Sequence, residues 1–163
     1  MPVTPFHFGP GAALHAVAPK QVSFIAFCAA NVFIDVESGY NLLQGNDRVH
    51  AFLHSYVGAT LVIAATVALF VVLNWFANRY PLPNLFEWRD LKTRQVLIRS
   101  ALGAYSHVAL DSIMHADMTP FYPLTDANPM LRLVSLDMLH TGCVALGVLG
   151  AGLVAVRLYR SRG

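Results

Sequence analysis

The sequence predicts an all-α protein, a single membrane-embedded domain over residues 1–163 with about four transmembrane helices and a short N-terminal helical arm. Long charge-free apolar runs, a shortage of charged residues and the lack of polar linkers predict this class. Of the 163 residues, 56 % are hydrophobic and 12 % are charged, whereas a soluble domain carries about 25 % charged residues. The mean hydropathy is +0.52. We therefore expect a lipid bilayer to surround much of the surface.

The first two predicted elements have the shortest apolar runs. The arm is expected over Gly9–Val17, where Pro10 suits a helix start and Pro19 suits its end, and it could lie beside the first span. The first span is expected over Gln21–Ile34, which is long enough only for a buried or partial crossing.

The remaining three spans follow in order. Ser55–Leu73 is free of charge and long enough to cross the hydrocarbon core. Val96–Met114 is apolar apart from one arginine, one histidine and one aspartate. Met138–Val156 is rich in glycine and alanine, as closely packed membrane helices are.

The charged residues are distributed unequally between the two ends of these spans. Basic residues concentrate in the segment 78–99 and at the C-terminus, so the positive-inside rule places both on the cytoplasmic side. Aspartates and histidines concentrate at the opposite ends, which predicts a histidine-rich face on the other side. The net charge of +2 is too small to indicate a nucleic-acid partner.

Seven histidines are many for so apolar a chain, and most fall near one predicted end of the bundle. His50 and His54 are four residues apart at the start of a span, which predicts two imidazoles on one helical face. His107 and Asp111 repeat that spacing inside another span, with His115 further around the helix. Ionisable groups inside a membrane are costly and normally face partners in the bundle interior.

Further polar residues flank the same end of the bundle. Asp35 and Glu37 end the first span and are expected to act as a general base or as ligands of a second metal. His7, just before the arm, joins His50, His54, His107 and Asp111 as a candidate metal ligand. Residues that could support those ligands from behind are His115, Asp117, Asp137 and His140. Zinc fits nitrogen and oxygen donors best, while manganese, iron or a dinuclear site would use the same residue types.

These stretches resemble the family of LexA-binding, inner-membrane-associated metal-dependent hydrolases. The family has an early histidine, a D-x-D at the end of an apolar run, H-x-G-x-x-H-S at the start of a transmembrane helix, and S-H-x-x-x-D followed by Thr-Pro. The matching stretches here are His7, Asp35-Val36-Glu37, His50-Ala51-Phe52-Leu53-His54-Ser55, Ser106-His107-Val108-Ala109-Leu110-Asp111 and Thr119-Pro120. The resemblance implies a bacterial-type inner-membrane location and metal-dependent hydrolysis, with His7, Asp35, His50, His54, His107 and Asp111 in the site.

Two further function classes stay open beside the hydrolase. A metal at His54, His107 and Asp111 would activate water against an ester or phosphoester, and the location favours a lipid or lipid-linked substrate. Paired histidines and aspartates inside spans also occur in small metal-ion or proton transport proteins. A structural membrane protein with a metal-stabilised core is the other alternative. The oligomeric state is left open.

Overall fold

The structure is a computed structural model that describes residues 4–18 and 24–160, and these form helices and loops without any strand. The predicted all-α class is therefore confirmed. Three short 3-10 helices accompany the α-helices: η1 (Thr4–His7), η2 (Phe52–His54) and η3 (Leu85–Asp90). The five α-helices of the described chain are α1 (Phe8–Val17), α2 (Phe24–Gln44), α3 (Tyr56–Ala77), α4 (Thr93–Met114) and α5 (Leu136–Arg160).

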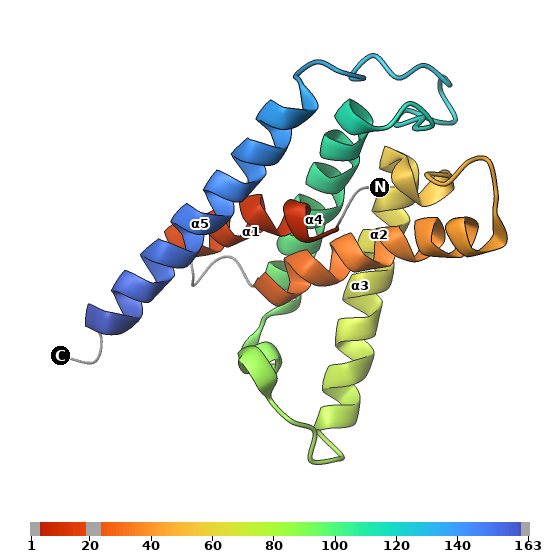
Figure 1. Cartoon of the computed structure of the whole chain (residues 1–163). Helices are drawn as coiled ribbons and strands as arrows, with labels where there is room; N and C mark the ends of the chain where they lie inside the picture. Colours follow the sequence, from red (N-terminus) through yellow and green to blue (C-terminus); the bar gives the residue numbers. More distant parts are fainter. Residues whose placement is uncertain (1–3, 19–23, 161–163) are drawn as a thin grey trace.

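The helices pack as a three-helix group and a two-helix group. α3 and α4 run antiparallel, and α2 crosses them, while α1 lies along α5 (Figure 1). The core of the first group is apolar, and its buried members include Ala30 and Ile34 of α2, Val62 of α3, and Val108 of α4. This core fixes the ends of three helices relative to one another, which is what positions the polar residues described below.

A glycine allows α2 and α4 to approach closely beside that polar region. A Cβ atom at Gly103 would lie 2.5 Å from the carbonyl oxygen of Phe27 and 3.0 Å from Nδ2 of Asn31. No side chain fits in that space, so only glycine lets the two backbones meet there. His107 lies one helical turn further along α4.

The N-terminal arm is confirmed as a helix, and its main partner is α5 rather than the first predicted span. A Cβ at Gly150 would lie 2.6 Å from the carbonyl carbon of Ala12, so the two helices touch backbone to backbone. Nη2 of Arg157 also donates a hydrogen bond of 2.6 Å to the carbonyl oxygen of Ala16. The glycines of α5 thus allow close helix packing against α1 within the same chain.

Two helices of the described chain, α3 and α5, are long and apolar enough to cross a membrane, where the sequence predicted four. α2 continues well past the predicted span Gln21–Ile34 and carries Asp35 and Glu37; residues 21–23 of that span lie outside the described chain. α4 covers the predicted third span but contains Arg94, Arg99, His107 and Asp111. Because of these charged and polar groups, α2 and α4 are less apolar than a typical membrane-spanning helix.

The two ends of the α3–α4 pair differ in chemistry. α3 begins directly after η2, close to where α4 ends, and the loop between α3 and α4 lies at the far end (Figure 1). That loop contains η3 and the basic residues Arg79, Arg89 and Lys92. The polar cluster lies at the other end, so the sequence's separation of basic and histidine-rich ends holds within the fold.

Candidate metal centre

Four side chains from three separate segments meet at the end of α4. Asp35 comes from α2, His54 from η2, and His107 and Asp111 from successive turns of α4. One nitrogen or carboxylate oxygen of each lies within 4.8 Å of the corresponding atom of every other. The side chains of His54, His107 and Asp111 are fully buried, and that of Asp35 is 19 % exposed.

Nitrogen and oxygen donors alternate around this group. Nε2 of His107 lies 3.1 Å from Oδ2 of Asp111 and 3.2 Å from Oδ1 of Asp35. Nε2 of His54 lies 3.5 Å and 3.4 Å from the same two oxygens. In a tetrahedral site with metal–ligand bonds of about 2.0–2.1 Å, neighbouring donor atoms lie about 3.3–3.4 Å apart. The four separations therefore match four of the six edges of a tetrahedral ligand shell.

Asn31 fixes the ring of His107 from behind. Nδ1 of His107 lies 2.9 Å from Oδ1 of Asn31, whose Nδ2 donates to the carbonyl oxygen of Phe27 at 2.9 Å. Because the amide nitrogen is used by the carbonyl, the amide oxygen faces the ring and accepts from Nδ1–H. When the ring is neutral, its lone pair is then on Nε2, which points at the two carboxylates.

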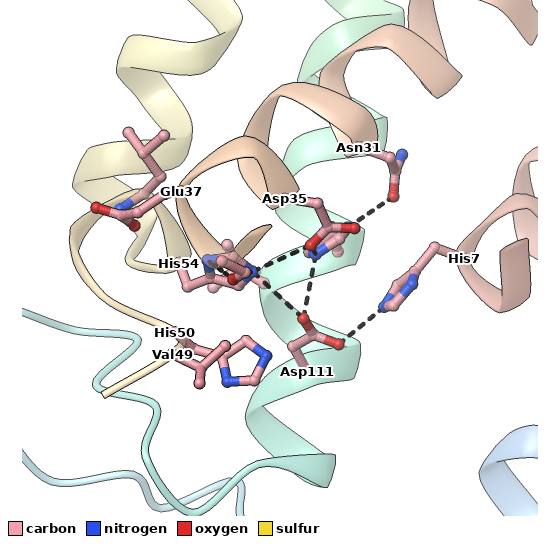
Figure 2. A network of polar contacts seen from close by, with 12 residues as sticks. His7, Asn31, Asp35, Glu37, Val49, His50, His54 and Asp111 are labelled. Atoms are coloured by element: carbon pink, nitrogen blue, oxygen red, sulfur yellow. Dashed lines mark hydrogen bonds and ion pairs between the residues drawn. The ribbon is translucent and has the colours of Figure 1, made fainter. Parts of the chain in front are cut away.

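His7 supports Asp111 from the opposite side. Its Nε2 lies 3.0 Å from Oδ1 of Asp111, and its ring stacks on that of His107 with centroids 4.1 Å apart. Figure 2 shows Asp111 between His7 and His54, with Asp35 nearby. His7 was predicted as a ligand, but the structure places it against the carboxylate rather than among the four donors.

His54 is presented by the turn before α3. Ser55 has an extended backbone, and its hydroxyl accepts a hydrogen bond of 3.0 Å from the amide of Gly58, which makes it the N-cap of α3. Burial lowers the pKa of His54 below its ordinary value, although Asp35 and Asp111 act against it. A neutral imidazole retains the lone pair that a metal needs.

A second group of donors shares Asp111 with the first and adds His50 and His115. Nδ1 of His50 lies 3.0 Å from both carboxylate oxygens of Asp117, which also accepts from the backbone amides of Val49 and His50. Burial acts to raise the pKa of Asp117, but these hydrogen bonds outweigh it and hold the pKa below its ordinary value. Burial, with the nearby His50, lowers the pKa of His115 to about 4.

Three other candidates lie away from the four donors. Glu37 accepts hydrogen bonds from the backbone amides of Phe52 and Leu53, at 3.2 Å and 2.6 Å, and so holds η2 in place. Figure 2 shows it on the side of α2 that faces away from Asp111. Asp137 is exposed at the start of α5, and the ring of His140 packs against Phe6 with centroids 4.8 Å apart.

The helical spacing was right for His107 with Asp111 and wrong for His50 with His54. His107 and Asp111 do share a face of α4. His50 and His54 precede α3, in an irregular loop and in η2, because Ser55 begins the helix after both of them. Their rings still meet edge to face, with centroids 4.9 Å apart. His115 is the C-cap of α4 with an extended backbone, so its direction does not follow the helical repeat.

Two polar residues of α2 were missed by the sequence analysis. Asn31 is four residues before Asp35 and Ser38 is three residues after it, so all three share a helical face. Oγ of Ser38 lies 3.4 Å from Nε2 of His54. A search for buried polar residues at helical spacing around Asp35 would have found both.

Comparison of the chain with family models, with curated proteins and with solved structures finds no match in any of the three.

Proposed function

We propose that the protein is a membrane-embedded, metal-dependent hydrolase that cleaves an ester or phosphoester of a lipid or lipid-linked substrate. The observation that carries this proposal is the group of Asp35, His54, His107 and Asp111, whose four donor atoms lie close enough together to hold one metal ion. Zinc is the metal that nitrogen and oxygen donors in this arrangement favour. The resemblance stated above points the same way and to a bacterial-type inner membrane.

The tautomer of His107 supports a cation at the centre of the group. With Nδ1–H bound to Asn31, the Nε2 lone pair faces oxygens of two carboxylates at 3.1 Å and 3.2 Å. A lone pair and two anions repel one another in a buried site unless a cation lies between them. A second proton on His107 is the competing explanation, and it predicts a protein without stoichiometric metal.

The exposure of the two apolar helices supports membrane embedding. In their most apolar stretches, only 28 % of α3 and 11 % of α5 is buried within the protein. The core helix of a soluble protein of this hydropathy would be mostly buried, so these surfaces are suited to lipid. By the positive-inside rule, the basic segment 78–99 and the C-terminus face the cytoplasm, and the metal site faces the other side.

An apolar cavity lined by the two sequence neighbours of His7 supports a lipid substrate. It has a volume of about 350 Å³ and is lined by Phe6, Phe8, Gly9, Ala12, Phe24, Cys143, Val144 and Gly147. Phe6 and Phe8 flank His7, which contacts Asp111. An acyl chain held there would lie against the segment that brings His7 to Asp111.

In the proposed hydrolysis, the cation and the protein residues have different roles. A divalent cation held by the four donors would supply a nucleophile if it bound a water as a fifth ligand, because it would lower the pKa of that water to near neutrality. Asp35 is the only one of the four donors whose side chain is partly exposed, so it can take up a proton from that direction. Asn31 and His7 hold the His107 ring and the Asp111 carboxylate in position.

The test combines metal content with turnover in detergent-purified protein. We expect stoichiometric zinc in the wild type, its loss in His107→Ala and Asp111→Ala, and a fall of at least about 100-fold in hydrolysis of lipid phosphoesters or esters. His15→Ala is the matched control, because its imidazole lies on α1 near Phe24 and outside both donor groups. Helical content by circular dichroism must be unchanged in all variants. Metal without turnover on any ester would favour the structural or transport alternatives, and absence of metal would refute the proposal.

A further inference from the structure

We propose that the centre holds two cations, the second bound by His50, His115 and Asp111, with Asp111 shared between them. This inference rests on the proposed function, since it needs the first cation at the four donors. It goes beyond it by assigning a second site, an open coordination position and a substrate class.

The first observation is the orientation of His50, whose side chain is almost fully buried. Its Nδ1 is engaged by the carboxylate of Asp117 at 3.0 Å, so the proton is on that nitrogen. Its Nε2 is buried and has no hydrogen-bond partner among the described residues. A histidine bound to a carboxylate through one nitrogen, with the other directed at a cation, is a common metal-binding arrangement.

The second observation concerns His115, which lies beside His50. The two rings stack with centroids 4.2 Å apart and planes 20° apart. Nε2 of His115 is likewise buried without a hydrogen-bond partner in the described chain. Leaving two such nitrogens unsatisfied costs free energy, and a cation that accepts both lone pairs removes this cost.

The third observation is the position of Asp111 between the groups. Oδ2 of Asp111 lies 3.1 Å from Nε2 of His107 and also has no aligned hydrogen bond within the described chain. Asp111 belongs to both donor groups, and each of its oxygens has two lone pairs. One carboxylate can therefore serve two cations.

The two sites differ in the number of protein donors, and this difference assigns their roles. The first offers four, which closes a tetrahedral shell, whereas the second offers three and leaves a position open. Substrate and water are expected to bind at the open position. Paired cations stabilise both the attacking and the leaving oxygen of an in-line displacement, so the substrate class is a phosphoester rather than a carboxylic ester.

The experiment measures zinc per chain by elemental mass spectrometry after the full-length protein has been loaded with zinc chloride and desalted. We expect two zinc ions in the wild type and in His15→Ala, and one in His115→Ala and His115→Gln. The same proteins loaded with manganese are expected to give the electron paramagnetic resonance signal of a coupled pair in the wild type and of isolated ions in the His115 variants. Asp117→Asn is expected to weaken only the second ion, by about 10- to 100-fold.

The outcomes separate this inference from the function on which it rests. One zinc ion in the wild type, unchanged by His115→Ala, would overturn the second site and leave the first intact. Two zinc ions that persist in both His115 variants would also overturn it. No zinc in a folded wild type would refute both the first site and the second. Retention of one ion in His115→Gln, with unchanged circular dichroism, excludes misfolding as the reason for the lost ion.

Discussion

The ring of His107 and the amide of Asn31 hold each other in one orientation, because Nδ1 of His107 donates to Oδ1 of Asn31 at 2.9 Å. The amide cannot rotate without losing its second hydrogen bond, to the carbonyl oxygen of Phe27. The tautomer of a proposed metal ligand is thus determined by a neutral residue on another helix, four residues before Asp35.

Removal of that amide should weaken metal binding without removing a ligand. For Asn31→Ala we expect zinc affinity to fall by about 10- to 100-fold, because the His107 ring is free to turn and to change tautomer. Competition with a chromogenic chelator measures the affinity. Asn74→Ala is the control, since Asn74 also donates to the carbonyl four residues earlier, at the other end of α3. Equal affinities in the two variants would contradict the role of Asn31.

Substitutions of Asp35 and of Glu37 should have different effects, although the two residues are only two positions apart. Asp35→Asn is expected to lose zinc and activity, since one of the four donors becomes a neutral amide. Glu37→Ala is expected to keep zinc and to lose about 1–2 kcal/mol of stability, because the amides of Phe52 and Leu53 lose a charged acceptor. Metal content and thermal unfolding distinguish them. Loss of zinc in Glu37→Ala at full helicity would instead place Glu37 in the site.

The close approach of α2 and α4 should be as important for zinc binding as the four donors themselves. For Gly103→Ala we expect loss of zinc, because the new Cβ would meet the carbonyl oxygen of Phe27 and force the helices apart. Gly152→Ala is the matched control, with no atom within 4 Å of the added Cβ. It should keep zinc and be slightly more stable, as alanine favours helix. The proposed packing is wrong if the two variants behave alike in metal content.

The apolar cavity should determine which chain length of substrate is preferred, without affecting metal binding. Val144→Phe puts a larger side chain into the cavity lined by Phe6, Phe8 and Gly147. We expect the KM for a long-chain substrate to rise several-fold while the KM for a short-chain substrate and the zinc content stay unchanged. Activity assays across chain lengths measure this. A uniform loss for all chain lengths would argue against acyl binding there.

The site was predictable where a single helix determines it. His107 and Asp111 are four residues apart within α4, and the helical repeat alone brings them together. His50 and His54 have the same spacing, but the cap at Ser55 begins the helix after them. They approach each other through an irregular loop held by Glu37 and Asp117, and no local pattern specifies such long-range contacts.

The all-α class could be predicted from the sequence, whereas the number of membrane-spanning helices was harder to predict. α3 and α5 were identified by uninterrupted apolar composition, which depends on the sequence alone. α2 and α4 are of similar length, but their buried faces carry polar residues such as Asn31 and Asp111. Whether a helix of mixed character crosses a membrane depends on how its polar face is covered by neighbours, which is a tertiary property.

The four donors also join parts of the chain that are distant in sequence, since Asp35, His54 and Asp111 are separated by two loops and a full helix. A cation bound to all of them would act as a reversible cross-link, comparable to a disulfide in a secreted protein, and its binding free energy would contribute to folding. Chelation would then loosen the ends of α2 and α4 next to η2. The opposite end of α3, where Arg89 donates to the carbonyl oxygen of Ala77, would keep its amide protection.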